Sequence, residues 1–207
     1  MDYAMSSLDF YDIDAAYADY LRKFEPRIPK FDYSTTSPHN KFLCGVVFET
    51  EKGIRYFAPV SSHIRNTPTN FVIQERSGKK ISNVCFQYMV PIPYGLEKRK
   101  FIKNEQDVSY RSLLNEEYYY CREGNSPERI RAMAAEVYDK VTNPVYRNSA
   151  DRQVRKFKYL CCNFKLLEEK CIEYAKEHNL ALTPPAAALD QGVKNDNSSS
   201  VTGETLQ

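Results

Sequence analysis

The stretch KFLCGVVFETEKGIRYFAPVSSHIRN, from Lys41 to Asn66, decides the fold of the chain. Two runs rich in aromatic and β-branched residues flank a Lys52-Gly53 turn, which is the pattern of a β-hairpin. The second run is followed by two serines, a histidine and an arginine. The segment therefore predicts two antiparallel strands, with a polar corner where the second strand ends.

The neighbouring segments extend this sheet and add one helix. Residues 8–13 alternate and contain aromatic rings, which indicates a short strand. Residues 14–24 carry apolar side chains at helical spacing, with Asp14 available as the N-cap. The runs 70–81 and 83–95 are β-prone and end at Gly or Pro residues. The first half is therefore expected to form an antiparallel sheet with one helix packed on it.

The second half has a helical period. Helices are expected over 107–123 and 125–143, and one or two more over 151–178. The fold class is therefore α+β, with a twisted antiparallel sheet and about four surrounding helices. We expect a single domain over residues 1–179 and a low-complexity tail over 180–207, which cannot bury much apolar surface.

Composition indicates a globular protein of the cytoplasm. No apolar run in the 207 residues approaches the ~20 residues of a membrane helix. The acidic N-terminus lacks the pattern of a signal peptide, so no membrane partner is expected. The six cysteines form no C-x-x-C pair, which predicts buried free thiols and no zinc site. Familiar cofactor and metal motifs are missing, so we expect no cofactor and no metal.

Charge is uneven along the chain. The segment from Lys41 to Lys103 holds eleven Lys and Arg against four Asp and Glu, whereas the first forty residues hold four against seven. A basic middle segment is typical of a surface that binds a polyanion. Dispersed lysines on a solvated face would give the same count.

The predicted hairpin gathers the groups that could carry chemistry. The start of its first strand lies beside the end of its second, so a lysine, two serines and a histidine come to one edge. Cations and hydroxyls can hold a phosphate, and an imidazole can transfer a proton near neutral pH. An ordinary polar hairpin end is the alternative. The candidates are Lys41, Ser61, Ser62 and His63 for catalysis, with His39 and Arg65 beside them.

A second basic cluster lies in DRQVRKFKYLCCNFK, residues 151–165. Basic groups can follow a nucleic-acid backbone while aromatic rings stack on bases. An amphipathic helix with a basic outer face is the alternative. The candidate RNA-binding residues here are Arg152, Arg155, Lys156, Lys158 and Phe164.

Several blocks together resemble the ToxN/AbiQ family, the endoribonuclease toxins of type III toxin–antitoxin and abortive-infection systems. They cover about residues 9–175 in the family's order. The blocks are FYDIDAAYADYLRKFEPRIP, KFLCGVVFE, YFAPVSS, YMVPIP, YRSLL and CNFKLLEEK. The resemblance implies a half-barrel sheet like that of MazF/Kid toxins and metal-independent RNA cleavage to a 2′,3′-cyclic phosphate and a 5′-hydroxyl. It also implies cellular mRNA substrates, a phage-defence role, and a repeated pseudoknot antitoxin RNA that the toxin processes and holds in a closed protein–RNA assembly.

The resemblance also implies roles for single residues. Lys41 matches the basic residue that heads the first core strand, and the serines match the family's hydroxyl pair. Tyr120 and Phe164 match aromatic positions of the helical half. Family members often continue the serine corner with proline and lysine, where this chain has His63 and Ile64. His63, or Arg65 one position after Ile64, is then the candidate to supply the missing charge.

Two other function classes stay open at this point. The basic segments would equally serve a non-catalytic RNA-binding module. A Ser–His hydrolase at Ser62 and His63 is a weaker alternative, because adjacent residues of an extended strand point to opposite sides.

Overall fold

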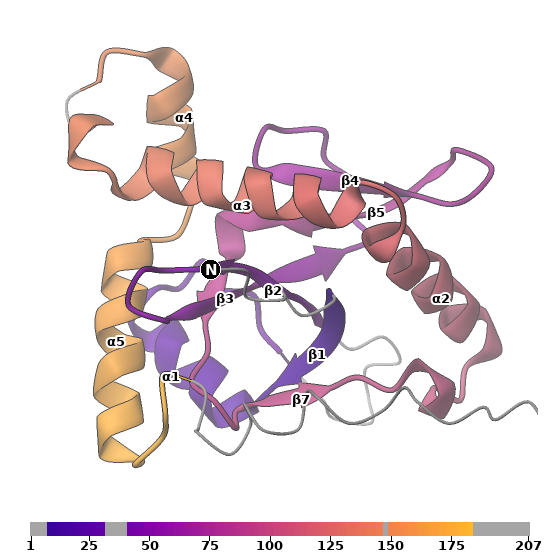
Figure 1. Ribbon diagram of the computed structural model, residues 1–207, viewed down its shortest axis with the longest axis horizontal. Coiled ribbons are helices and arrows are strands. Elements are labelled where there is room, and N and C mark those ends of the chain that lie inside the picture. The colour runs from indigo at the N-terminus through magenta and orange to yellow at the C-terminus, as the bar shows by residue number, and fades with distance from the viewer. Residues whose placement is uncertain (1–7, 32–40, 147–148, 184–207) are drawn as a thin grey trace, which may run out of the picture.

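The computed structural model describes residues 8–31, 41–146 and 149–183, and Figure 1 shows its helices around one sheet. The strands are β1 (Asp9–Ile13), β2 (Leu43–Glu49), β3 (Arg55–Ser61), β4 (Asn70–Gln74), β5 (Lys80–Cys85), β6 (Val90–Pro91) and β7 (Glu97–Arg99). The helices are α1 (Ala15–Phe24), α2 (Val108–Arg122), α3 (Ser126–Thr142), α4 (Arg152–Leu160) and α5 (Phe164–Glu177). Short 3-10 turns are η1 (Phe86–Tyr88), η2 (Ile102–Asn104) and η3 (Pro144–Tyr146).

The antiparallel sheet predicted from the first half is confirmed. Within the described ranges, seven strands form one open sheet in the order β4-β5-β3-β2-β1-β7, and β6 pairs with β3. Every pairing is antiparallel. The hairpin around the Lys52-Gly53 turn is also confirmed, since Leu43 lies opposite Pro59 and Glu49 lies opposite Arg55.

Two parts of the sheet differ from the expectation. The β-prone run 83–95 is not one strand, because β5 ends at Cys85 and the η1 turn leads into the two-residue β6. Proline cannot donate to a ladder, so a run that contains Pro91 and Pro93 pairs only briefly. The second difference is β7, which was not predicted. It is short and charged, and it pairs with β1 at the sheet edge, where such sequences are tolerated.

The helices largely follow the sequence pattern. The N-cap of α1 is confirmed, since Asp14 Oδ1 accepts a hydrogen bond from the Tyr17 N–H at 2.9 Å. The run 151–178 forms two helices, so the described chain has five α-helices rather than about four. Asn163 separates them, because its side chain accepts from the Leu166 N–H at 3.2 Å and caps α5.

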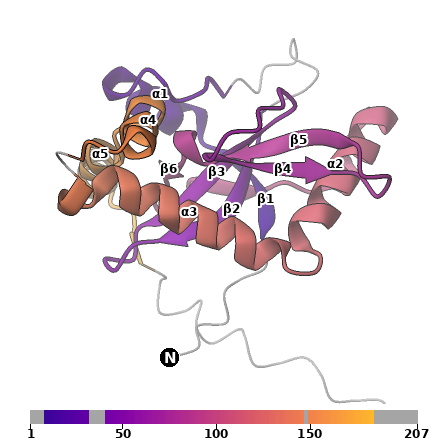
Figure 2. The ribbon, with the colours of Figure 1, turned by 90° about the horizontal axis from the view of Figure 1, so that it is seen from above.

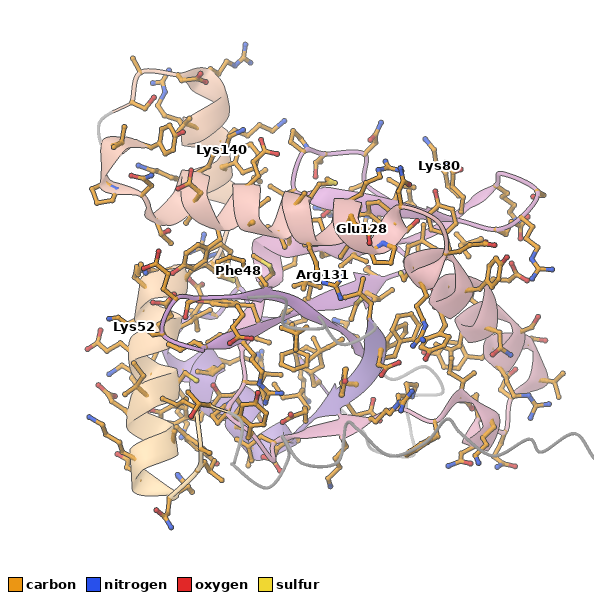
Figure 3. The ribbon with its side chains drawn as sticks, viewed as in Figure 1. Phe48, Lys52, Lys80, Glu128, Arg131 and Lys140 are labelled. Carbon is orange, nitrogen blue, oxygen red and sulfur yellow. The ribbon has the colours of Figure 1, made fainter. Side chains whose placement is uncertain are left out.

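The helices form two groups around the sheet. Figures 1 and 2 show α1, α4 and α5 gathered at one end and α2 at the other, with α3 running between them. Phe48 of β2 packs against Tyr138 of α3, with ring centroids 4.6 Å apart (Figure 3). Gly45 of β2 allows a close approach of Phe57, since a Cβ at Gly45 would lie 2.1 Å from that ring. Dense aromatic packing thus fixes β2 and β3 between the helix groups.

All six cysteines are free and buried, as the sequence predicts. Burial raises the pKa of the Cys161 thiol to about 12 and that of Cys171 to about 11. In the segments that the structure describes, no helix has both the length and the apolar character required to cross a membrane.

Candidate active site

The mouth of the β2–β3 hairpin brings the predicted catalytic groups together. Lys41 lies two residues before the start of β2, and Ser61 is the last residue of β3. The Val60 N–H donates a hydrogen bond to the Phe42 carbonyl at 3.0 Å, which fixes the two chain segments side by side. The expected juxtaposition of Lys41 with the serines is therefore present.

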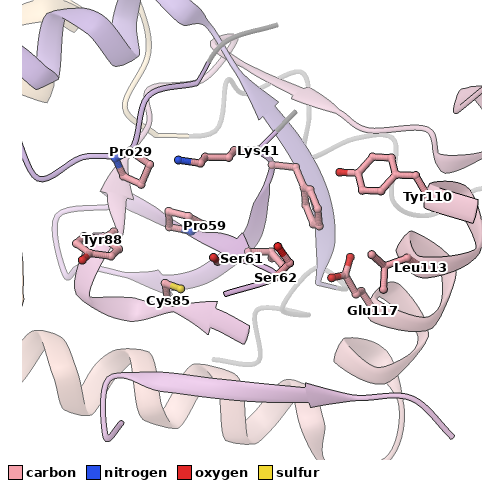
Figure 4. A pocket seen from close by; sticks show the side chains of 12 residues that line it. Pro29, Lys41, Pro59, Ser61, Ser62, Cys85, Tyr88, Tyr110, Leu113 and Glu117 are labelled. Atoms are coloured by element: carbon pink, nitrogen blue, oxygen red, sulfur yellow. The ribbon is translucent and has the colours of Figure 1, made fainter. Parts of the chain in front are cut away.

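These residues line one cavity of about 280 Å³. Figure 4 shows Lys41 on one side and Glu117 on the other, with Ser61 and Ser62 between them. Ligand pockets are typically about 300–1,000 Å³, so this one suits a small group such as a phosphodiester rather than a long segment. Its other lining residues are Pro29, Phe42, Pro59, Val60, Cys85, Tyr88, Tyr110 and Leu113.

The buried side chain of Asn83, on β5, holds the serine corner in shape. Its Oδ1 accepts a hydrogen bond from the Arg65 N–H at 2.7 Å. Its Nδ2 group donates to the carbonyls of Ser61 at 3.2 Å and His63 at 3.3 Å. One amide thus satisfies three backbone groups where β3 ends and the loop after it begins. Sequence reasoning missed this residue, although an Asn inside a β-prone run is a signal in itself.

The two candidates for the missing corner charge, His63 and Arg65, are both exposed, and neither lines the cavity. The backbone N–H of His63 donates to Ser61 Oγ at 3.2 Å and its carbonyl accepts from Asn83, so these described bonds of His63 involve its backbone and do not reach Ser62. His39 lies outside the described residues.

Arg65 acts electrostatically on the wall of the cavity. Burial raises the pKa of the Cys85 thiol to about 11, and the Asn83 side chain, the Arg65 guanidinium and the Lys41 ammonium each lower it in part. Both cations are therefore close enough to act on the same lining residue. An anion in the cavity would experience both positive charges.

Glu117 is an acidic group that the sequence analysis did not single out. It is 3% exposed, and its Oε2 atom has no hydrogen-bond partner among the described residues. Burial raises its pKa from 4.5 to about 7, partly offset by the nearby Ser82 hydroxyl. The signal was its place on the buried stripe of α2, three residues after Leu114 and four before Cys121.

The two aromatic candidates lie away from this cavity. Tyr120 is half-buried and packs on Phe71, with centroids 6.0 Å apart. It lines a separate cavity of about 540 Å³ together with Arg129 of α3. Phe164 is fully buried and packs against Tyr56. The stacking role expected for Phe164 does not fit this position, because its ring belongs to the core.

The basic cluster of α4 forms a surface and not a pocket. Figures 1 and 2 show α4 at the end of α3 opposite α2. Phe157 is buried beneath the helix, while Tyr159 is 82% exposed. Lys158 is half-buried, and its Nζ donates to the Tyr146 carbonyl at 2.5 Å. The exposed cations of the cluster are Arg152, Arg155 and Lys156.

In the ranges described, no group of three or more His, Cys, Asp or Glu side chains is placed to hold a metal ion. The cavity offers cations, hydroxyls and one buried carboxyl, which suit the binding of an anion and the transfer of a proton.

Two curated proteins are similar to the chain over most of its length. Endoribonuclease ToxN of Bacillus thuringiensis subsp. kurstaki is 28% identical over 177 residues, with 83% of this chain and 86% of that protein covered. Endoribonuclease ToxN of Pectobacterium atrosepticum is 24% identical over 179 residues, with 82% and 95% covered.

Solved structures of similar proteins match the chain over the same part of its length. One comes from work on type III toxin–antitoxin systems, in which a non-coding RNA pseudoknot selectively inhibits the toxin. It is 26% identical with a TM-score of 0.72, covering 83% of this chain and 99% of that one. The anti-phage endoribonuclease AbiQ is 20% identical with a TM-score of 0.68 and the same coverage, and it supports the fold alone. The family model for toxin ToxN of type III toxin–antitoxin systems matches residues 9–172. The chain therefore belongs to the ToxN family of toxins.

Proposed function

We propose that the protein is an endoribonuclease toxin of a type III toxin–antitoxin system, with its active site at the mouth of the β2–β3 hairpin. The observation that carries the proposal is the shared cavity of Lys41, Ser61 and Ser62 in a chain of the ToxN family. A named relative is an endoribonuclease, and a solved relative is a toxin inhibited by an RNA pseudoknot. A pseudoknot RNA is accordingly the inhibitory partner, and RNA is the substrate.

The proposed reaction uses the ribose itself as the nucleophile. Ser61 and Ser62 hold the scissile phosphate, and Lys41 stabilises the charge that develops on the phosphorane. The 2′-hydroxyl gives its proton to an imidazole of the corner, that of His63 or of His39, and attacks phosphorus, and the bond to the 5′ oxygen breaks. The products are a 2′,3′-cyclic phosphate and a 5′-hydroxyl, and this route requires no metal.

The proposal extends to the whole molecule. Residues 1–179 act as one endoribonuclease domain, and 180–207 are a tail. The open sheet corresponds to the half-barrel of MazF/Kid toxins. The protein works in the cytoplasm, where its RNA substrates are, and forms a closed assembly with its antitoxin RNA.

The test is cleavage of RNA by the purified protein in EDTA, followed by identification of the RNA ends. Cyclic phosphates and 5′-hydroxyls are expected, and 3′-hydroxyl ends or loss of activity in EDTA would contradict the mechanism. Lys41→Ala should slow cleavage by roughly 10²–10³-fold with RNA affinity largely kept. Lys52→Ala is the matched control, because Lys52 is exposed at the far turn of the same hairpin (Figure 3).

The basic surface of α4 favours a second candidate, a non-catalytic RNA-binding module. This module would titrate RNA without cutting it. In that case Lys41→Ala would lower growth inhibition and RNA affinity together, and the affinity would depend steeply on salt.

A further inference from the structure

We infer that Glu117 is the general acid of the cleavage reaction, protonating the 5′ oxygen as it leaves. The inference rests on the proposed function and adds to it the group that completes the proton transfer. Its evidence is the position of the Glu117 carboxyl in the cavity of Lys41 and the serine pair.

The geometry places Glu117 opposite Lys41. Figure 4 shows the serine pair between the ammonium side and the carboxyl side of the cavity. In-line attack on a phosphate puts the entering 2′ oxygen and the leaving 5′ oxygen on opposite sides of phosphorus. A phosphate held at Ser61 and Ser62 would thus present one of these oxygens toward Glu117.

Burial favours the protonated form of the Glu117 carboxyl. Glu117 is 3% exposed on the apolar face of α2, where Gln or Leu would avoid the desolvation of a charge. Oε2 is buried and makes no close hydrogen bond among the described residues, and the nearby Ser82 hydroxyl offsets the effect of burial only in part. The carboxyl can therefore still form a hydrogen bond to a group of the substrate.

The charges around the carboxyl favour the acid role over the base role. Burial favours the neutral form of Glu117 and raises its pKa to about 7, and the Ser82 hydroxyl offsets this only in part. A phosphodiester anion that enters the cavity adds a like charge and favours the neutral form further. The other titratable groups that face this region are Cys85 from β5, Tyr110 and Cys121 from α2, and Cys44 from β2.

The step balances without any other reactant. The proton of the 2′-hydroxyl goes to the imidazole base of the corner, His63 or His39, the bond from the 2′ oxygen to phosphorus forms, and the bond from phosphorus to the 5′ oxygen breaks. Glu117 gives its proton to the 5′ oxygen and is left as a carboxylate in the cavity that Lys41 also lines. After the products leave, solvent takes the proton from the imidazole base and returns one to Glu117.

The deciding experiment compares two RNA substrates with the full-length protein. One is ordinary RNA, and the other carries sulfur in place of the scissile 5′ oxygen. Thiols ionise near pH ~8.5, so a thiolate leaves without being protonated. Glu117→Gln should slow cleavage of ordinary RNA by roughly 10²–10⁴-fold, yet cleave the sulfur substrate within a few-fold of the unchanged protein.

The pH profile gives a readout that a structural role would not move. The unchanged protein should lose activity as the pH rises above about 7, and Glu117→Gln should lack that falling limb. Glu117→Asp retains an acid and should keep the limb while cleaving ordinary RNA faster than Glu117→Gln. Glu116→Gln is the matched control, because Glu116 is the adjacent residue of α2 and lies outside the cavity.

Each outcome has a distinct meaning. Equal impairment of Glu117→Gln on both substrates overturns the inference, and so does unchanged cleavage of ordinary RNA. In either case the proposed endoribonuclease function stands, because the unchanged protein still cuts. Failure of the unchanged protein to cut any RNA would instead overturn the proposed function and the inference with it.

Discussion

Asn83 and Arg65 are joined across the sheet edge by a hydrogen bond of 2.7 Å from the Arg65 N–H to the Asn83 Oδ1. The side chain that accepts this bond also donates to the two carbonyls of the serine corner. The shape of the corner therefore depends on a residue that lies about twenty positions further along the chain and carries no charge.

Replacing this amide should weaken both the fold and the reaction. Asn83→Ala leaves three backbone groups without partners, which we expect to lower the free energy of unfolding by about 1–3 kcal/mol. Cleavage should slow more than RNA binding weakens, since the serines lose their orientation. Denaturant unfolding and cleavage rates check this, with the exposed Asn115→Ala as the control. Full activity of Asn83→Ala would show that the serine corner keeps its conformation without the Asn83 side chain.

Moving the positive charge between neighbouring positions can show which residue supplies it at the serine corner. Arg65→Ala should reduce cleavage by roughly 10-fold or more, because a cation that acts on the cavity is lost. Adding Ile64→Lys to that variant returns a cation to the position where family members often have lysine, and it should recover most of the rate. Cleavage assays on the two variants decide the point. If His63→Ala is the more damaging change and Ile64→Lys does not help, the imidazole and not Arg65 carries the role.

Glu117 should make stability depend on pH. Its pKa is raised from 4.5 to about 7 on folding, so the folded state binds the proton more tightly than the unfolded state. The contribution of Glu117 to stability is then fully present below pH 4.5 and is lost as the pH rises to about 7. The loss is at most about 1.4 kcal/mol per pH unit.

This loss is measurable as a difference between two proteins. Denaturation of the unchanged protein and of Glu117→Gln at several pH values should give a difference that shifts in favour of the variant between pH 4.5 and 7. Glu116→Gln, on the same helix, should show no comparable shift. A pH-independent difference for Glu117→Gln would mean that its carboxyl titrates normally.

The basic surface of α4 should contribute affinity and not chemistry. Replacing Arg152, Arg155 and Lys156 with Ala should weaken RNA binding and reduce the salt dependence of the affinity by up to about two to three charges, at ~0.7–0.9 per phosphate contact. The rate at saturating RNA should stay unchanged, because these residues are far from the cavity. Lys176→Ala, an exposed change on α5, is the control. An unchanged salt slope would remove α4 from the RNA interface.

Much of the fold could be predicted from local pattern because its elements obey simple periods. The β2–β3 hairpin was legible from alternating apolar runs around Lys52-Gly53, and α1 from its Asp14 cap. The edge strand β7 could not be predicted, since Glu97–Arg99 carries only charged side chains. It forms a strand by pairing with β1. The β-prone run after Asn83 was overestimated because the prolines that close it outweigh its propensity.

Only the part of the site that lies on one hairpin could be predicted from the sequence. Lys41 and the serines could be placed together because a turn fixes their distance along two strands. Glu117 and Asn83 reach the same place through tertiary packing of α2 and β5, which no local spacing encodes. The predicted stacking role of Phe164 was wrong because its local sequence, an aromatic residue beside lysines, does not reveal that the packing of α5 buries the ring.

The six buried thiols have a practical consequence. Their burial in the folded chain, with the pKa of Cys85 and Cys171 raised to about 11, leaves alkylating reagents little thiolate to attack. Opening of the chain would expose all six at once. Alkylation of the native cysteines can therefore act as a clock of unfolding that needs no engineered label site.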